Sequence, residues 1–336
     1  MNEKVSVIIP AYNAEATIDR CLKSLLNQNT QDKYRIIVLN DGSNDSTLSR
    51  LAKYADNNKI DVINKKNTGA SDTRNQGLNL VKSKYVTFVD ADDYVEPDYL
   101  ESLLRQYSNR KCDLSIIGYC KEDTDKTVRF KGLGNKEILN RERALHDILV
   151  STGYEGYLWN KLFKMSIIRK NDIKFDSAIN IAEDLLFCCK YVSYCDYVSL
   201  DPEVKYHYVV NDNSQINSKK YGSEFTESSM DILKVYEQIK LMVVTMNYPK
   251  VISAINASIV WSSTSILRMI YLAPNKSSVS SEVMSKLKEN QRIYRHDFLK
   301  NDILPKRDKV IYWFNYYFPS LFAILWRKMQ LRGNGF

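Results

Sequence analysis

Residues 86–93 read Val86-Thr87-Phe88-Val89-Asp90-Ala91-Asp92-Asp93, a mostly apolar run that passes directly into three carboxylates. The apolar part is typical of a buried strand. Ligands of open α/β sheets bind beyond the carboxyl ends of strands, and closely spaced carboxylates repel one another unless a cation or proton intervenes. The stretch therefore predicts either a site for a hard divalent cation or an Asp-rich turn that caps the helix near Asp98.

Strand and helix patterns alternate through the first part of the chain. This alternation predicts an α/β fold with a mostly parallel, Rossmann-like sheet and helices on both faces. The expected strands are 5–10, 34–39, 60–63 and 85–89, and the expected helices are 15–27, 46–57 and 71–82. From about 225 to 271 the pattern is helical, so we expect a helical C-terminal region.

Composition narrows the class of protein. The 336 residues are 44% hydrophobic and 26% charged, as in soluble globular proteins. Residues 286–336 contain eleven Lys or Arg against four Asp or Glu, which accounts for most of the net charge of +8. This distribution argues against a nucleic-acid-binding core and favours an anionic partner such as a membrane for the C-terminal part. Six cysteines without CxxC spacing and a strand pattern from Val5, without a signal peptide, predict a reduced, cytoplasmic protein.

Two further strand ends carry candidate binding residues. Pro10, Ala11, Tyr12 and Asn13 follow the first strand, where a tyrosine ring can stack on a flat base and small residues let backbone groups approach a ligand. Asp41 follows the second strand and can accept from the imide N–H of a uracil. It can equally be a turn residue that caps the next helix.

Arg74 lies one turn inside the helix expected at 71–82. Its guanidinium can bind a diphosphate or position Asp90, and the alternative is a surface ion pair.

Four segments together resemble the inverting family 2 glycosyltransferases, which have the GT-A nucleotide-sugar fold. They are VSVIIPAYNAE (5–15), LNDGSNDST (39–47), NTGASDTRNQGL (67–78) and FVDADD (88–93). Residues 159–163 and 182–187 also look like segments of that family. The resemblance covers about residues 3–215, so we expect a catalytic domain over 1–215 and a helical region over 216–336.

The resemblance implies a binding site for a nucleotide sugar, with UDP as the expected nucleotide. In this site Tyr12 would stack near the base, Asp41 would bond the uracil, and Asp90 would lie near the ribose. The other expected binding residues are Pro10, Ala11, Asn13, Arg74 and Ala91. Asp92 would be the principal ligand of Mg²⁺ or Mn²⁺, which would neutralise the charge that builds on the leaving nucleoside diphosphate.

The resemblance also implies that Asp184 is the general base that takes the proton of the acceptor hydroxyl. Glu183 is the adjacent alternative and a candidate acceptor-binding residue. Charges that only complement a helix N-terminus are the structural alternative for both. Trp159 can line the acceptor site or belong to the core.

His207 is a candidate ligand of the metal or diphosphate, with packing as the alternative. Many relatives carry an arginine after the neighbouring tyrosines, whereas this chain has Val209 and Val210. Diphosphate contacts from this segment are therefore in question.

Residues 306–328 are rich in aromatic and apolar side chains between basic flanks. The segment is slightly short for a transmembrane helix, and its composition suits the membrane interface. The alternative is a helix packed on the catalytic domain or on a partner in a homo-oligomer.

These observations predict a metal-dependent inverting glycosyltransferase, peripheral at the inner face of a bacterial membrane. It would transfer a hexose or N-acetylhexosamine to a glycan or lipid-linked acceptor during synthesis of a surface polysaccharide such as a capsule. Nucleic acid is not an expected partner. The alternatives are a catalytically silent nucleotide-sugar-binding scaffold and a sugar-phosphate nucleotidyltransferase. The second would carry a Gly-rich basic loop after the first strand, which this chain lacks.

Overall fold

The computed structural model describes residues 3–108, 112–122, 128–131, 134–150, 154–210, 224–301 and 304–331. The chain forms two compact units. Unit 1 consists of Met1–Ala144, Gly156–Ala178 and Glu183–Asn211, and unit 2 consists of Leu145–Glu155, Ile179–Ala182 and Asp212–Phe336. The expected domain boundary near residue 215 lies outside the described residues.

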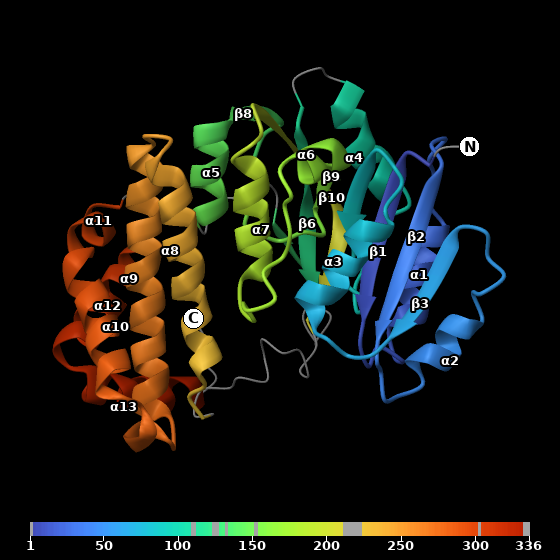
Figure 1. The fold of residues 1–336 in the computed structure, drawn as a ribbon. Helices are drawn as coiled ribbons and strands as arrows, with labels where there is room; N and C mark the ends of the chain where they lie inside the picture. Colours follow the sequence, from blue (N-terminus) through green and yellow to red (C-terminus); the bar gives the residue numbers. More distant parts are fainter. Residues whose placement is uncertain are drawn as a thin grey trace. The chain divides into compact units, whose positions relative to one another are not determined.

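Unit 1 is built on one sheet, in which the described residues form ten strands in the order β3-β2-β1-β4-β9-β6-β10-β5, with β7 beside β6 and β8 beside β10 (Figure 1). The strands are β1 (Val5–Ala11), β2 (Tyr34–Asp41), β3 (Ile60–Lys65), β4 (Tyr85–Phe88), β5 (Tyr94–Val95), β6 (Leu114–Glu122), β7 (Val128–Lys131), β8 (Glu137–Asn140), β9 (Lys161–Lys164) and β10 (Tyr197–Val209). The first four are parallel, and β9 is antiparallel to both of its neighbours, β4 and β6. The sheet is therefore mixed.

Helices cover both faces of the parallel part. The helices assigned to unit 1 are α1 (Ile18–Leu26), α2 (Thr47–Ala52), α3 (Ala70–Leu80), α4 (Tyr99–Arg105), α6 (Met165–Lys170) and α7 (Glu183–Val192). Val7 and Ile9 of β1 belong to the core cluster that contains the apolar face of α1. Ile8 points to the opposite face, where a Cβ at Gly77 of α3 would lie 2.7 Å from its Cγ2. The expected α/β fold with helices on both faces is confirmed.

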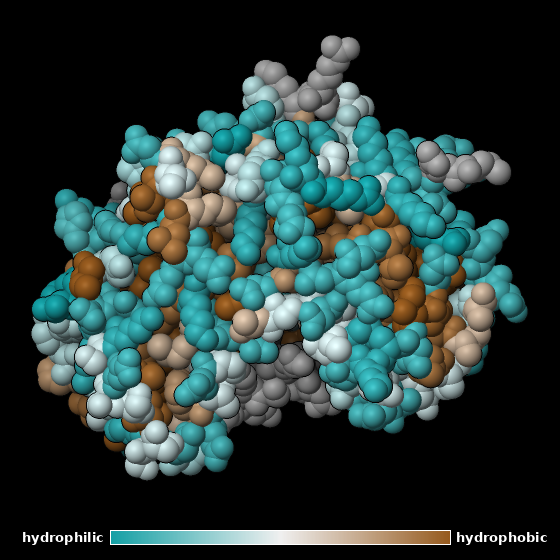
Figure 2. Space-filling model, viewed as in Figure 1, coloured by the Kyte–Doolittle hydropathy of each residue, from teal (hydrophilic) through white to brown (hydrophobic). Residues whose placement is uncertain are grey.

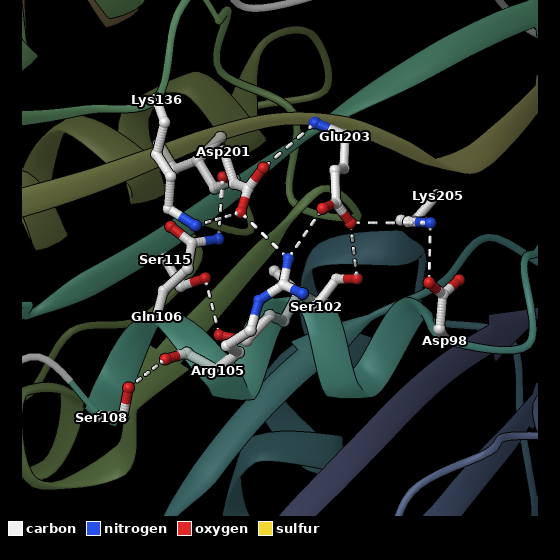
Figure 3. A network of polar contacts seen from close by, with 12 residues as sticks. Asp98, Ser102, Arg105, Gln106, Ser108, Ser115, Lys136, Asp201, Glu203 and Lys205 are labelled. Carbon is white, nitrogen blue, oxygen red and sulfur yellow. Dashed lines mark hydrogen bonds and ion pairs between the residues drawn. The ribbon is translucent and has the colours of Figure 1, made fainter.

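The middle of β10 is held by a network of charged side chains (Figure 3). Register shifts interrupt the pairing of β10 with β6. At this irregularity Arg105 of α4 contacts Asp201 at 3.3 Å and Glu203 at 2.9 Å. Lys205 pairs with Asp98 at 2.7 Å just before α4. The network anchors β10 where the strand approaches the loop that follows β4.

Unit 2 is helical, as expected. Its helices are α8 (Asp231–Val244), α9 (Pro249–Leu272), α10 (Ser281–Ile293), α11 (Arg295–Lys300), α12 (Lys306–Tyr317) and α13 (Pro319–Leu331), and α5 (Arg141–Leu149) runs from unit 1 into unit 2. The continuous helical pattern expected over 225–271 is divided, because Asn247 has a left-handed φ of 55° and Pro249 starts α9. Val260 of α9 packs with Phe298 of α11 and Tyr312 of α12.

Candidate functional site

Three adjacent strands bring the predicted binding residues to one edge of the sheet. β1 pairs in parallel with β2 and with β4. Tyr12 follows β1, Asp41 ends β2, and Asp90 follows β4 after one further residue. Because parallel strands end at the same edge, these residues share that edge.

The acidic loop after β4 is fixed by its last carboxylate. Asp93 is fully buried and accepts hydrogen bonds from Tyr206 Oη at 2.6 Å and from the Val209 amide at 2.8 Å. Burial, followed by the charges of Asp90 and Asp92, raises the pKa of Asp93 well above its usual value. Asp93 thus ties the loop to β10 and is turned away from solvent. Ala91 is also in the core.

Arg74 joins the acidic loop to helix α7. Its Nη1 donates to Glu183 Oε1 at 2.8 Å, and its Nη2 lies 3.7 Å from Asp90 Oδ1. The guanidinium also lies over the ring of Phe175, 5.6 Å from the centroid. Only 12% of the Arg74 side chain is exposed, so the surface-ion-pair alternative is wrong.

Asp184 lies on the first turn of α7. Its Oδ1 accepts from the amide of Leu185 at 2.8 Å. Burial and then the charge of Glu183 raise the pKa of Asp184 to about 7, although Arg74 acts in the opposite direction. A carboxylate with this pKa can accept a proton near neutral pH. Since Glu183 is already bonded to Arg74, Asp184 remains the first candidate for the base and Glu183 the second.

The electrostatics at this edge fit a divalent cation. Burial raises the pKa of Asp90 to about 6; Arg74 opposes the shift, while Asp92 and Glu183 add to it. A diphosphate would bring further negative charge to these carboxylates, which a Mg²⁺ or Mn²⁺ ion with oxygen ligands would offset. Asp92 is partly exposed beside Asp90, and the two suit such an ion.

The nucleotide side of the edge contains an exposed aromatic ring. Tyr12 is 46% exposed, so its ring is accessible to a base. Asn13 has a left-handed φ of 49°, and its amide donates to Ser43 Oγ at 3.0 Å while its Oδ1 accepts from the Asn44 amide at 2.9 Å. These bonds hold the end of β1 against the loop after β2. Pro10 and Ala11 are the last two residues of β1.

Asp41 has a structural role that sequence reasoning missed. It forms an ion pair with Lys65 and accepts from the amides of Thr68 at 2.9 Å and Gly69 at 3.0 Å. Burial alone would raise the pKa of Asp41, but the hydrogen bonds from Lys65 and Thr68 outweigh it and lower this pKa below its usual value. Asp41 thus anchors the loop before α3, and it is not the N-cap of α2, which is Ser46. Its bond to uracil remains a prediction.

Both ring nitrogens of His207 contact side chains of unit 1. Nδ1 lies 3.1 Å from Cys120 Sγ and 2.8 Å from Glu122 Oε1, and Nε2 lies 2.7 Å from Glu96 Oε1. Burial opposes protonation, but the bonds with Cys120, Glu96 and Glu122 outweigh it and raise the pKa of His207 to about 9. Its role at the donor's metal stays a prediction.

Trp159 occupies the core. Its ring is stacked between aromatic neighbours, with centroids 4.3 Å from Tyr206 and 4.8 Å from Tyr157, and the residue is 4% exposed. The core alternative describes this position better than a wall of an acceptor site.

A mixed sheet whose parallel strands β1, β2 and β4 end beside acidic residues fits the GT-A fold expected from the sequence, and the comparisons with known proteins agree. The family model "Glycosyl transferase family 2" matches residues 6–165. TarP of Staphylococcus aureus, a poly(ribitol-phosphate) beta-N-acetylglucosaminyltransferase, is 32% identical over 69% of this chain and 72% of its own length. The putative glycosyltransferase EpsH of Bacillus subtilis is 32% identical over 67% of this chain and 66% of its own length. The chain belongs to glycosyl transferase family 2, so the expected family and enzyme class are confirmed.

Solved structures show the same fold. The S. aureus TarS fragment 1–349, determined in complex with UDP-GlcNAc, has a TM-score of 0.64 and 20% identity, and the match covers 92% of this chain and 83% of that one. The mannosyltransferase PcManGT of Pyrobaculum calidifontis, determined with GDP-Man and Mn²⁺, has a TM-score of 0.52, 13% identity, and coverage of 95% and 88%.

Proposed function

We propose that this protein transfers a sugar from a UDP-sugar to a hydroxyl of a glycan or lipid-linked acceptor, with inversion of the anomeric carbon, in the synthesis of a bacterial surface polysaccharide. The observation that carries the proposal is the Asp90–Arg74–Glu183 chain, which connects the expected donor site to the helix turn that bears Asp184. Burial and the charge of Glu183 raise the pKa of Asp184 to about 7, which suits a general base and favours an enzyme over a scaffold.

In the proposed reaction Asp184 takes the proton of the acceptor hydroxyl while that oxygen bonds to the anomeric carbon. The bond between this carbon and the nucleoside diphosphate breaks on the opposite face, so one displacement inverts the anomer. Arg74 holds Glu183 and Asp90, which keeps the base helix in position relative to the donor loop. Asp92, with Asp90 beside it, would hold a divalent cation, which supplies Lewis-acid stabilisation of the leaving diphosphate.

The UDP specificity is supported by two kinds of observation. TarS, a structural neighbour, was determined with UDP and with UDP-GlcNAc. At the strand edge of this chain, the exposed ring of Tyr12 is available for a base, and Asp41 lies at the end of the adjacent strand. The relative TarP is named for transfer of N-acetylglucosamine to poly(ribitol-phosphate). Polyol-phosphate and glycan acceptors are therefore the first to test with this protein.

The test is a panel of UDP- and GDP-sugars assayed for Mn²⁺-dependent donor hydrolysis and for binding. Asp184→Asn should bind the donor normally and lose roughly 10²–10⁴-fold in transfer rate. Asp172→Asn is the matched control, because Asp172 is on an exposed turn and pairs only with Lys174 in the contacts described. If no donor is bound or hydrolysed with metal present, the proposal fails. If Asp184→Asn binds the donor and still transfers the sugar at the wild-type rate, Asp184 is not the base.

A second part of the proposal concerns the two C-terminal helices. Their buried side contains Ile311, Tyr312, Phe322 and Trp326. Eight aromatic and apolar residues of the two helices and of the turn between them are 44–55% exposed: Val310, Trp313, Phe314, Tyr317, Phe318, Leu321, Ile324 and Leu325. We name these eight residues the C-terminal apolar stripe. Apolar side chains also reach the surface of unit 2 on the face shown in Figure 2.

We propose that the C-terminal apolar stripe lies on the inner face of the membrane. Exposed Lys306 and Arg307 precede it and exposed Lys328 follows it. A symmetric contact with a second copy would bring these basic groups together, whereas anionic lipid would neutralise them. Trp and Tyr at such positions are typical of membrane interfaces. Among the described residues, no helix has the length and hydropathy needed to span a bilayer.

Flotation with vesicles tests this proposal in the full chain. Wild type should float with vesicles that contain anionic lipid, and Trp313→Ser combined with Leu321→Ser should float at least several-fold less. Leu241→Ser, which changes a leucine 74% exposed on α8, is the control and should float like wild type. Undiminished flotation of the double variant would overturn the membrane proposal, and a concentration-dependent change from oligomer to monomer in that variant would favour a homo-oligomer.

A further inference from the structure

Three side chains with different metal-binding atoms meet on strands β6 and β10. The sulfur of Cys120, a carboxylate oxygen of Glu122 and a ring nitrogen of His207 all lie within 4.8 Å of one another. Cys120 and His207 are register partners on the two parallel strands. Glu122 follows Cys120 by two residues, and therefore points to the same face of the sheet.

We propose that Cys120, Glu122 and His207 form a binding site for a transition-metal ion of the Zn²⁺ class, with a ligand set of its own beside the cation site expected at Asp92. Thiolate, imidazole and carboxylate together suit Zn²⁺, which takes four ligands and leaves one position here for water. Mg²⁺ prefers oxygen ligands in an octahedron, so this set would select against the ion expected at the diphosphate.

The observed distances are close to those of a bound state. Nδ1 of His207 lies 3.1 Å from Cys120 Sγ and 2.8 Å from Glu122 Oε1. Around zinc, bond lengths of about 2.0–2.3 Å in a tetrahedron separate neighbouring ligand atoms by roughly 3.2–3.6 Å. The two separations that include His207 therefore need to increase by roughly half an ångström, which side-chain rotation can supply while the strands stay in place.

Outer partners orient two of the three ligands. Glu96 Oε1 lies 2.7 Å from His207 Nε2, on the ring nitrogen away from the proposed ion. Such a carboxylate fixes the imidazole tautomer and raises its basicity as a ligand. Tyr94 donates from Oη to Glu122 Oε1 at 2.5 Å and stacks on the His207 ring at a centroid distance of 4.2 Å. Both contacts are the kind that surround functional metal ligands.

A bound ion would cross-link β6 and β10. Through Glu122, which accepts from Tyr94 Oη, the ion would also hold Tyr94 of β5 in place. Tyr94 is only two residues beyond Asp92. Since binding to the folded state stabilises that state, we expect a higher unfolding temperature with Zn²⁺. Metal ligands bind in their deprotonated form, so the apparent affinity should rise with pH.

The experiment is a Co²⁺ titration of the full chain, reduced and stripped of metal, without any nucleotide. We expect a thiolate-to-cobalt charge-transfer band that saturates at one equivalent and disappears on addition of Zn²⁺. Cys120→Ser should lose the band, and His207→Gln and Glu122→Gln should bind at least roughly tenfold more weakly. Cys112→Ser, a buried cysteine just before β6, and Asp92→Asn should keep it.

The Co²⁺ titration of the wild-type protein tests the proposal even if a variant misfolds. Absence of the band in wild type at a clear excess of Co²⁺ overturns the proposal. A band of undiminished strength in Cys120→Ser, with circular dichroism like that of wild type, also overturns it, because the thiolate would then come from another cysteine. Neither result depends on the donor or on transfer, so this test and that of the proposed function can fail separately.

Discussion

Arg74 Nη1 donates to Glu183 Oε1 at 2.8 Å across 109 residues of sequence. The pair joins α3, which starts after the donor edge of the sheet, to the first turn of α7. Both side chains are largely buried, with 12% and 17% exposure. One ion pair therefore connects the part of unit 1 expected to bind the nucleotide with the part expected to act on the acceptor.

Removing Arg74 should cost both stability and activity. Arg74→Ala leaves Asp90 and Glu183 without their partner, which for a pair this buried costs about 2–4 kcal/mol of unfolding free energy. Arg74→Lys keeps the charge but loses the fork that reaches both carboxylates, so its loss should be intermediate. Denaturant unfolding and donor binding measure the two effects. Arg35→Ala removes a more exposed pair with Asp61 and should cost below about 1 kcal/mol; an equal loss in both variants would contradict the proposed role of Arg74.

The rate of transfer should depend on pH through Asp184. Below its pKa, raised to about 7, the carboxyl holds a proton and cannot accept another. We therefore expect kcat/KM to rise with pH and to level off above about 7. Arg74 lowers the pKa of Asp184 through its charge. In Arg74→Lys the shorter side chain places the charge farther from Asp184, so the midpoint of the profile should move to higher pH. A flat profile from pH 5 to 8 at saturating metal would exclude Asp184 as the base.

Asp92 should control the response to metal. Asp92→Asn keeps the shape of the side chain and removes the charge expected to bind the cation. We expect the Mn²⁺ concentration for half-maximal donor binding to rise by roughly tenfold or more, since carboxylate charge sets the affinity for hard ions. Asp172→Asn is the control because the exposed Asp172 pairs with the exposed Lys174. Calorimetric titration of Mn²⁺ with and without UDP provides the measurement, and an unchanged response in Asp92→Asn would remove this residue from the metal site.

Much of the fold was predictable from the sequence, since periodicity identified four parallel strands and their helices. The antiparallel strands β5 and β9 were not predicted. β5 has only two residues, and β9 has a lysine at each end where the equally short β4 continues an apolar run, so both form only because neighbouring strands provide pairing partners.

The site was predictable in its composition more than in its contacts. Strand ends identified Tyr12, Asp41 and Asp90, because parallel strands end together. The bonds of Asp41 to the Thr68 and Gly69 amides arise from a loop conformation that no spacing specifies. Likewise the burial of Asp93 depends on Tyr206, which is 113 residues away in sequence.

The hydrogen bond from Tyr206 to Asp93 should be needed for the shape of the acidic loop. Tyr206→Phe keeps a ring that can stack on Trp159 but leaves one oxygen of a buried carboxyl without its 2.6 Å partner. We expect a loss of about 1–3 kcal/mol in unfolding free energy together with weaker donor binding. Tyr54→Phe, which removes a bond to the more exposed Asp19, should cost less and leave donor binding unchanged. Unaltered donor binding in Tyr206→Phe would show that Asp93 does not set the loop.

The close approach of α3 to β1 should tolerate no added methyl at Gly77. A Cβ at this position would lie 2.7 Å from Cγ2 of Ile8, and Ile8 is fully buried in the sheet, so it has little room to move. Gly77→Ala improves helix propensity by up to about 1 kcal/mol, but overpacking costs about 1–3 kcal/mol, so we expect a net loss. Because Arg74 lies three residues earlier on the same helix, a displaced α3 should also weaken donor binding. Denaturant unfolding of a double-mutant cycle separates the causes: Ile8→Ala removes Cγ2, so Gly77→Ala should cost less in that background than in wild type. Equal costs in both backgrounds would show that the contact with Ile8 is not what requires glycine.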